Sequence, residues 1–286
     1  MKTPSKITRI KWADVEASIN TLENVEGGYT LAKRGLVTLP NGLQVFFKEG
    51  VDAQTGSWSK KEVAVYEFLE ANQYPFIPKL LAHNKTDNAF AIEALTDGNG
   101  WEWLKPWTNK RLRATLQAMD TLEALTSAYI TKKFPEVALI SAADDGWGPL
   151  ARSKERQVQL LTKLRNTGRI DIAEALDFDE NAVRSSQFSF RDDTLVHYDV
   201  RSDNSAWNNT LAEVKLVDWS FAQIGDTRID SAAVFVDAQR SGLDVLPEHT
   251  ERLDASALQW LAGFWLNSAP QISQADKPDH LRDYQL

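Results

Sequence analysis

The chain has 286 residues, of which 43% are hydrophobic and 25% are charged, a composition typical of a globular protein with one large domain or two lobes. It contains no cysteine, which excludes disulfides, thiolate catalysis and a cysteine-based metal site. A net charge of −8 argues against a nucleic-acid partner, which needs a basic face, and no run of about 18 apolar residues exists for a membrane span.

The first 25 residues begin with a polar leader that lacks the apolar run of a secretory signal, so we expect a cytoplasmic protein. A short amphipathic helix is predicted next, because apolar residues recur there at three- and four-residue spacing. These residues are Trp12, Val15, Ile19 and Leu22.

Gly27 and Gly28 follow, and two adjacent glycines permit a tight turn and a close approach of the backbone to a ligand. A hairpin comes next, since Pro40-Asn41-Gly42 separates the apolar runs 35–39 and 43–47, and Asn-Gly in that place is a strong turn signal. Its second strand ends at Lys48.

A helix is predicted to begin at Ser59, which forms a capping-box pattern with Glu62 and is followed by apolar residues at helical spacing. Residues 76–83 and 88–95 then predict two more strands. The tryptophan-rich stretch 98–107 is the expected boundary between an N-terminal lobe, residues 1–97, and a C-terminal lobe, residues 98–286.

The second half is expected to be mainly helical. Helical spacing runs from Thr108 to about Lys133, a loop contains Gly146-Trp147-Gly148-Pro149, and further helices begin at Ser153 and cover 170–176. Later helices are predicted from Asp230, as an N-terminal cap, and across 257–265.

The central stretch is 195–222, where two short apolar runs, 194–197 and 214–217, predict strands. Asp199 and Asp218 each follow one of these runs, and Asn204 lies between them. A carboxylate and a carboxamide on a short loop can converge with a second carboxylate to hold a divalent cation, leaving one carboxylate free as a base. Phosphoryl transfer requires that arrangement, because its catalysis is mostly positioning and charge neutralisation.

The pattern H-x-D-x-x-x-x-N followed by V-D-W resembles the aminoglycoside phosphotransferase family of the protein-kinase-like superfamily. That family usually has H-G-D-L-H-x-x-N, so Tyr198 takes the place of its glycine and Arg201 that of its second histidine. The resemblance implies an α+β, two-lobed fold, with a small antiparallel sheet and one helix in the N-terminal lobe and a larger, mostly helical C-terminal lobe.

The resemblance also implies the roles of individual residues. Asp199 would be the catalytic carboxylate, Asn204 and Asp218 the Mg²⁺ ligands, and Lys48 the contact to the nucleotide phosphates. Glu62 would hold Lys48, with Glu67 as the other candidate, and His197 would bond backbone near Asp218. The remaining nucleotide contacts would come from Gly27, Gly28 and the backbone of Glu93 to Leu95.

The implied activity is transfer of the γ-phosphoryl group of ATP, or of GTP, to a hydroxyl group of a small molecule. The acceptor could be an aminoglycoside or another amino or sugar alcohol. A non-catalytic nucleotide-binding protein of the same fold stays as the alternative, against which the intact Lys48, Asp199, Asn204 and Asp218 argue.

Overall fold

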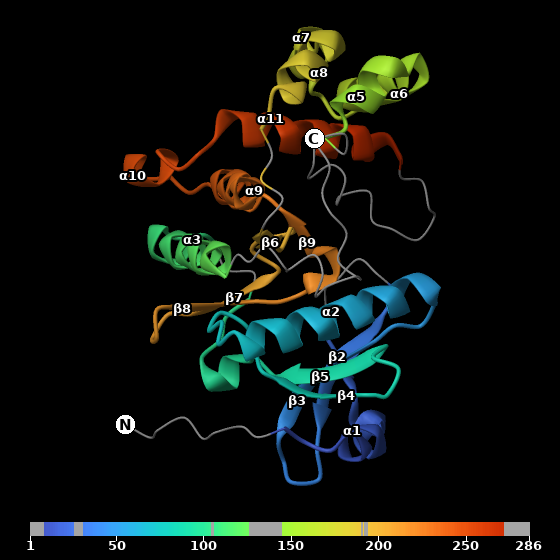
Figure 1. The fold of residues 1–286 in the computed structure, drawn as a ribbon, viewed down its shortest axis with the longest axis vertical. Coiled ribbons are helices and arrows are strands. Elements are labelled where there is room, and N and C mark those ends of the chain that lie inside the picture. Colours follow the sequence, from blue (N-terminus) through green and yellow to red (C-terminus); the bar gives the residue numbers. More distant parts are fainter. Residues whose placement is uncertain are drawn as a thin grey trace.

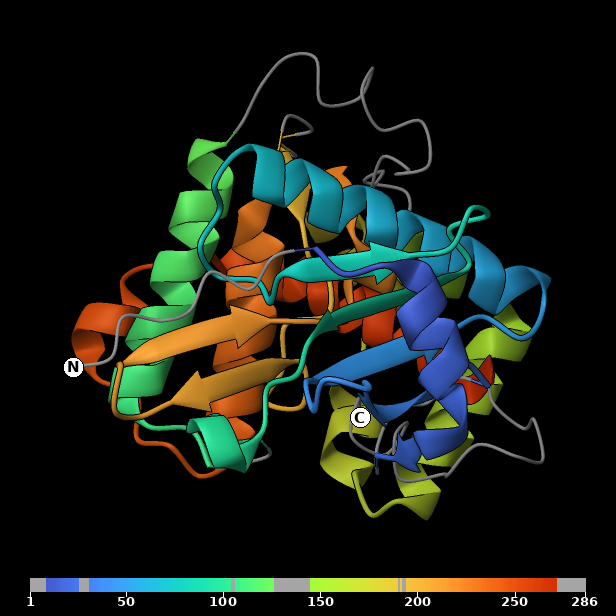
Figure 2. The ribbon, with the colours of Figure 1, turned by 90° about the horizontal axis from the view of Figure 1, so that it is seen from below.

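The computed structural model describes residues 9–25, 31–103, 106–125, 145–189, 191 and 194–271. Its N-terminal part is a five-stranded antiparallel sheet in the order β1-β2-β3-β5-β4. One long helix, α2, packs beside this sheet (Figures 1 and 2). The elements here are α1 (Trp12–Ser18), η1 (Ile19–Thr21), β1 (Glu23–Asn24), β2 (Lys33–Thr38), β3 (Gln44–Glu49), α2 (Ala53–Ala71), β4 (Leu80–His83), β5 (Ala89–Glu93) and η2 (Asp97–Asn99).

The predicted hairpin is confirmed as β2 and β3. Its turn closes through two hydrogen bonds, from the Leu39 amide to the Leu43 carbonyl and from the Gly42 amide to the Leu39 carbonyl, both 2.8 Å long. Gly42 has a φ of +81°, which a glycine adopts without strain, and the Asn41 side chain accepts a bond from the Leu43 amide.

The predicted start of the long helix is wrong. Helix α2 begins six residues before Ser59, and its capping box is formed by Asp52 and Thr55 instead. Asp52 has an extended backbone and accepts the Thr55 amide at 2.7 Å, so Asp52 rather than Ser59 is the N-cap of this helix. Glu62 is therefore in the interior of the helix, where its side chain is available to another partner.

The C-terminal part is larger and mostly helical, and lies above the sheet in Figure 1. Residues 126–133, the predicted end of the helix that begins after Thr108, lie outside the described residues. The elements are α3 (Asn109–Ala124), α5 (Trp147–Arg152), α6 (Lys154–Asn166), α7 (Ile170–Ala175), α8 (Phe178–Ser186), β6 (Thr194–Val196), β7 (Ser205–Asn208), β8 (Glu213–Leu216), η4 (Trp219–Phe221), β9 (Gln223–Gly225), α9 (Thr227–Arg240), α10 (Pro247–Thr250), α11 (Ala255–Ser268) and η5 (Ala269–Gln271).

Several of these elements differ from prediction. Residues 147–149 of the predicted loop begin a short helix, α5, which Gly146 precedes, and α8, β7 and β9 were not predicted. Strands β7 and β9 are needed because β8 pairs with β7, and β6 pairs with β9, in two separate antiparallel ribbons. The cap of α9 is Asp226, whose side chain accepts the Arg228 amide, and not Asp230.

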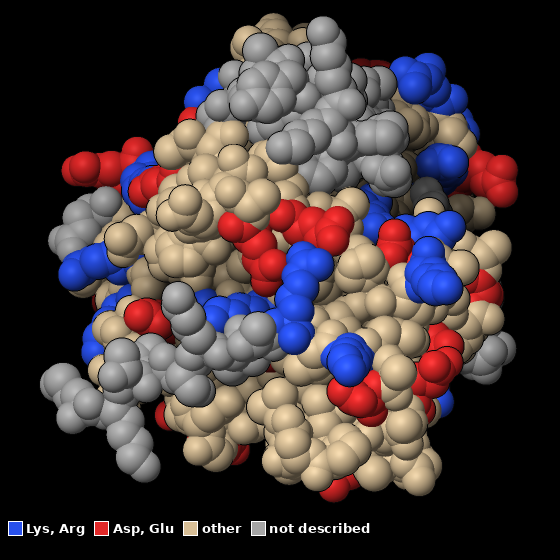
Figure 3. All heavy atoms as spheres, turned by 60° about the horizontal axis from the view of Figure 1, so that its bottom comes forward, with Lys and Arg blue, Asp and Glu red and all other residues tan. Residues whose placement is uncertain are grey.

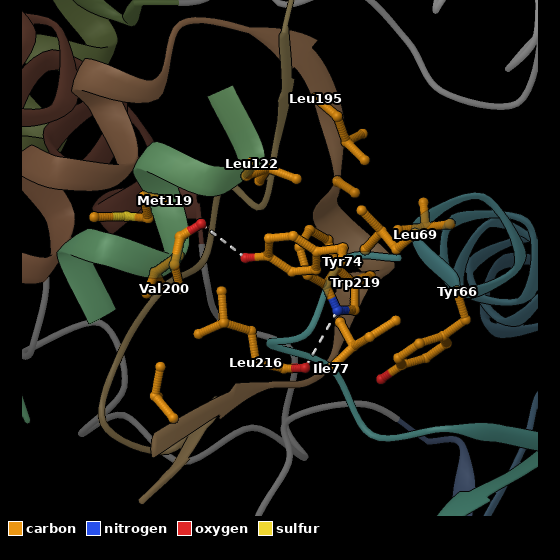
Figure 4. Close-up of a cluster of buried hydrophobic side chains, with 14 of the residues drawn as sticks. Tyr66, Leu69, Tyr74, Ile77, Met119, Leu122, Leu195, Val200, Leu216 and Trp219 are labelled. Carbon is orange, nitrogen blue, oxygen red and sulfur yellow. Dashed lines mark hydrogen bonds between the residues drawn. The ribbon is translucent and has the colours of Figure 1, made fainter. Parts of the chain in front are cut away.

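The main hydrophobic core joins α2 to the C-terminal elements. Figure 4 shows Tyr66 and Leu69 from α2 in one cluster with Met119 and Leu122 from α3 and with Trp219. The Tyr74 side chain also extends into this core, and its hydroxyl donates to the Ala118 carbonyl at 3.0 Å. The segment around Asp218 is thus fixed from both parts of the chain.

No helix among the described residues is long and apolar enough to cross a membrane. On the face shown in Figure 3, acidic and basic side chains are interspersed, so that face presents no extended surface of one charge.

Candidate active site

Lys48 and Glu62 form a buried ion pair between β3 and α2. Side chains alternate along β3, so Val45 and Phe47 face the cluster under α1 while Lys48 faces α2. The Lys48 Nζ atom lies 2.5 Å from the Glu62 carboxylate, and the two residues are only 6% and 1% exposed. Glu67, the other candidate, instead lies near Arg9 and His83 at the surface.

Lys48 also reaches the segment after β8, because its Nζ atom lies 2.9 Å from the Asp218 carboxylate. Burial opposes the charge on Lys48, but Asp218 and Glu62 outweigh it and raise its pKa. Burial likewise opposes the charge on Asp218, but Lys48 holds the pKa of that carboxyl well below its usual range. Both groups are therefore charged at neutral pH.

Asp218 has an uncommon backbone conformation, with a φ of +63° that favours glycine. The Ser220 hydroxyl donates to the same Asp218 oxygen that Lys48 contacts, at 2.8 Å. The next side chain, Trp219, is fully buried and its ring lies 4.5 Å from that of His197. Strain at one residue persists here because the surrounding side chains determine its position.

The loop before Asp199 is held from below by Asp230. Its carboxylate accepts the backbone amides of His197 and Tyr198, both at 2.7 Å, so Asp230 holds this loop rather than capping α9. The His197 ring bonds the Val217 carbonyl at 2.9 Å, as predicted. Burial lowers the pKa of His197 to about 4, so the neutral ring donates its Nε2 proton to that carbonyl.

Asp199 and Asn204 are in direct contact. The Asn204 side-chain nitrogen donates to the Asp199 carboxylate at 2.9 Å and to its backbone carbonyl at 2.8 Å. Burial raises the pKa of Asp199 to about 7, although the Arg201 guanidinium 3.4 Å away acts in the opposite direction. The raised pKa suits a general base near neutral pH.

The group formed by Lys48, Glu62 and Asp218 lies next to the pair formed by Asp199 and Asn204. The Val217 amide donates to the Asn204 carbonyl at 3.0 Å, and the charge on Asp218 acts on the pKa of Asp199. The structure thus brings together Lys48, Glu62, Asp199, Asn204 and Asp218, as the sequence predicted.

The resemblance in the sequence implies a magnesium ion, and the donor set fits one. Because the Asn204 nitrogen is turned toward Asp199, its amide oxygen remains for a cation, and one Asp218 oxygen remains beside the one that bonds Lys48. No group of three or more acidic or histidine side chains that could hold a metal occurs among the described residues. Two protein oxygens and nucleotide phosphates are the kind of ligand set that Mg²⁺ takes.

Of the residues predicted to contact the nucleotide, Glu93 and Leu95 lie among the described residues. The Leu95 carbonyl accepts the Trp103 indole N–H at 2.7 Å, and the Glu93 amide bonds the Lys79 carbonyl at 2.9 Å. These bonds occupy the Leu95 carbonyl and the Glu93 amide, so a base edge would have to meet other backbone groups of this segment. Gly27 and Gly28 lie outside the described residues.

Sequence reasoning missed several buried polar residues that contact this site. Arg111, on α3, and Asp237, on α9, both bond the loop that carries Asn204. A signal was present, because each is a charged residue among the apolar core positions of its helix, Asp237 within the run Ala232 to Ala238. Buried charges are rare unless they are paired or functional.

No protein-family model and no curated protein matches this sequence. Among solved structures, the macrolide 2′-phosphotransferase MphH from Brachybacterium faecium is similar with a TM-score of 0.57, at 12% identity over 93% of this chain and 91% of that chain. The choline kinase LicA from Streptococcus pneumoniae gives 0.56, at 12% identity over 89% and 86%. Aminoglycoside 2′-phosphotransferase-IIIa with GDP gives 0.56, at 13% identity over 94% of both chains.

These similarities define the class of the molecule, which has the protein-kinase-like fold with a small antiparallel sheet and a larger helical part. The resemblance to aminoglycoside phosphotransferases that the motifs indicated is confirmed at the level of the fold.

Proposed function

We propose that the chain is a magnesium-dependent phosphotransferase that moves the γ-phosphoryl group of ATP or GTP to a hydroxyl group of a small molecule. The observation that carries the proposal is the continuous contact from Glu62 through Lys48 to Asp218, beside the paired Asp199 and Asn204. Few other activities need one buried cation, two oxygen donors and a base within a single site.

Each side chain has a role that follows from its surroundings. Lys48 is charged and is held in place by Glu62, so it can neutralise nucleotide phosphates. Asn204 and Asp218 would hold the Mg²⁺ ion, which neutralises phosphate charge when it is bound. We assign Gly27, Gly28 and the backbone of Glu93 and Leu95 to the nucleotide, with the boundary between the lobes after residue 97.

Asp199 is the base of the proposed reaction. The acceptor oxygen forms a bond to the γ-phosphorus while the bond from that phosphorus to the leaving oxygen of the nucleoside diphosphate breaks. The hydroxyl proton passes to the Asp199 carboxylate. Asn204, which donates to one oxygen of that carboxylate, fixes its orientation toward the acceptor.

The similar structures support this choice and suggest the acceptor class. The aminoglycoside enzyme among them holds GDP, and the others are named as macrolide and choline enzymes. We therefore propose an amino alcohol, sugar or aminoglycoside-like acceptor, and a cytoplasmic location where ATP or GTP is available.

The test is release of ADP or GDP from Mg-ATP or Mg-GTP across a panel of aminoglycosides, macrolides, amino alcohols and sugars. Wild-type protein should show acceptor-stimulated release, and Asp199→Asn should lower it by about 10² to 10⁴-fold while nucleotide still binds. Asp179→Asn, the same change at an exposed site on α8, should leave it unchanged.

An Asp199→Asn variant with wild-type turnover would refute the mechanism. Nucleotide binding without transfer to any acceptor on the panel would favour the non-catalytic alternative.

A further inference from the structure

The turn that carries Asn204 is held by a buried arginine from another helix. The Arg111 side chain on α3 is 1% exposed, and its Nη2 atom donates to the Ser202 carbonyl at 2.9 Å. The same atom donates to the Ser205 carbonyl at 2.7 Å and to the Ser205 hydroxyl at 2.8 Å. These acceptors lie on both sides of Asn204 in the chain.

A buried carboxylate from α9 holds the same turn from a second direction. The Asp237 Oδ2 atom accepts the Ser202 amide at 2.7 Å and the Trp107 indole N–H at 2.7 Å. The Trp107 ring in turn lies 4.5 Å from the Arg111 guanidinium. Arg111, Trp107 and Asp237 therefore form one connected group, which we call the loop clamp.

The loop clamp acts on a different end of the loop from Asp230. Asp230 bonds the amides of His197 and Tyr198, directly before Asp199, whereas the loop clamp bonds Ser202 and Ser205, on either side of Asn204. We propose that Arg111 and Asp237 are positioning residues that set the Asn204 side chain for the metal ion. This proposal rests on the proposed function, because it assigns the metal to Asn204.

The physical reason is that the turn and the two bonds from the Asn204 side-chain nitrogen to Asp199 together determine where its side-chain oxygen lies. Its amide donates to the Arg201 carbonyl at 3.1 Å and its carbonyl accepts the Val217 amide, so any shift of the turn moves the side-chain oxygen. Arg111→Lys keeps the positive charge but replaces a planar, multiple donor with a shorter point charge that cannot reproduce three bonds. Residues that orient metal ligands typically change metal affinity by about 10- to 100-fold.

The experiment measures metal dependence separately from nucleotide affinity. Binding of a fluorescent ATP analogue to the full chain is titrated in EDTA and then against increasing Mg²⁺. Arg111→Lys should raise the half-saturating Mg²⁺ concentration about 10-fold and leave the metal-free nucleotide affinity within about twofold. Ser205→Ala, which removes the hydroxyl that accepts from Arg111 and donates to the Arg201 carbonyl at 3.0 Å, should raise it by a smaller factor in the same direction.

Thr115→Val is the matched control, because Thr115 is buried one turn further along α3 and its hydroxyl bonds only the Arg111 carbonyl within that helix. It should leave the half-saturating Mg²⁺ concentration unchanged. Hydrogen exchange of the peptide spanning 199–207 provides a second measurement, and it should be faster in Arg111→Lys and Ser205→Ala than in Thr115→Val.

The outcomes separate the two proposals. Wild-type protein without Mg²⁺-dependent nucleotide binding would refute the proposed function. The loop clamp alone would be refuted by a different result. In that case wild-type protein binds nucleotide with Mg²⁺, and both Arg111→Lys and Ser205→Ala show the wild-type Mg²⁺ dependence and the wild-type rate of hydrogen exchange. If Arg111→Lys does not fold, Ser205→Ala and Asp237→Asn carry the same comparison.

Discussion

Tyr198 has a strained backbone conformation at the position where the aminoglycoside phosphotransferase motif has glycine. Its φ is +67°, in the left-handed region where the resembling family has glycine. The ring compensates, because it packs edge-on against Trp260 and Phe264 of α11, with centroids 5.7 and 5.2 Å away. Tyrosine at this position therefore lacks the backbone freedom of glycine but makes contacts with α11, directly beside Asp199.

We expect Tyr198→Gly to be less destabilising than Tyr198→Ala, the reverse of the usual order. Both lose the ring contacts, worth up to about 3 kcal/mol. The left-handed conformation costs an alanine about 1–2 kcal/mol, while glycine loses roughly 0.5–1 kcal/mol more backbone entropy than alanine on folding. Glycine should thus be favoured by about 0.5–1 kcal/mol in urea unfolding, and an alanine variant of equal or greater stability would contradict the strain argument.

At the scale of elements, the crossing of α5 and α11 depends on Gly263. A Cβ atom built there would lie 2.2 Å from the Trp147 ring and 2.4 Å from the Asp145 carbonyl oxygen. Trp147 cannot move away freely, because its indole N–H donates to the Gln259 carbonyl at 2.7 Å. The two helices approach closely only because no side chain separates them.

Gly263→Ala should therefore lower the free energy of unfolding by about 1–3 kcal/mol, as overpacking does. Gly56→Ala, within α2, is the matched control, since its nearest neighbour would be an Asn88 carbon at 3.9 Å. There the higher helix propensity of alanine should stabilise the protein by about 0.5–1 kcal/mol. Urea unfolding of both variants should give shifts of opposite sign, and shifts of the same sign would show that Trp147 relaxes.

The start of α9 makes stability depend on pH. Asp226 is 1% exposed, and burial would raise its pKa, but bonds from the Arg228 side chain and amide and from the Arg191 amide outweigh this and lower it. A carboxyl with a lowered pKa stabilises the fold above its unfolded pKa, and this contribution disappears as the pH falls through the folded value.

Asp226→Asn keeps a capping oxygen but loses the charge, so it should be less stable than wild type by about 1–3 kcal/mol at pH 7. That difference should shrink as the pH falls below about 4, where the carboxyl takes up a proton in the unfolded chain before it does so in the folded protein. Urea titrations from pH 7 to pH 3.5 measure it, and a difference that is constant with pH would show that the ion pair contributes nothing.

Sequence patterns predicted elements where the signal was local and failed where it depended on distant partners. The Asn41-Gly42 hairpin and the Lys48–Glu62 pair followed from turn chemistry and from a known motif. The start of α2 was misplaced because Asp52 and Ser59 offer similar capping patterns, and the structure forms the capping box of Asp52 with Thr55. The pKa of Asp199 depends on burial by residues far away in the chain, which no local pattern reports.

At the scale of the whole molecule, one hydrophobic core contains residues from both sides of the proposed lobe boundary after residue 97. Val63 and Leu69 of α2 belong to the same buried cluster as Leu112 of α3 and Phe235 of α9. The Lys48–Asp218 ion pair crosses between the same parts of the chain. Each lobe thus completes the core of the other, which favours unfolding as one cooperative unit.

Two spectroscopic probes can test that cooperativity, because the tryptophans are unevenly placed. Only Trp12 and Trp58 of the ten tryptophans precede residue 98, so fluorescence reports mainly on the C-terminal lobe, whereas far-UV circular dichroism reports on α2 and the sheet as well. We expect both probes to give one urea midpoint. Leu69→Ala, at a fully buried position of α2, should lower both midpoints together by an amount equivalent to about 2–5 kcal/mol. A fluorescence midpoint unchanged by Leu69→Ala would mean that the C-terminal lobe is stable without its contacts to α2, and that the shared core only docks two independent lobes.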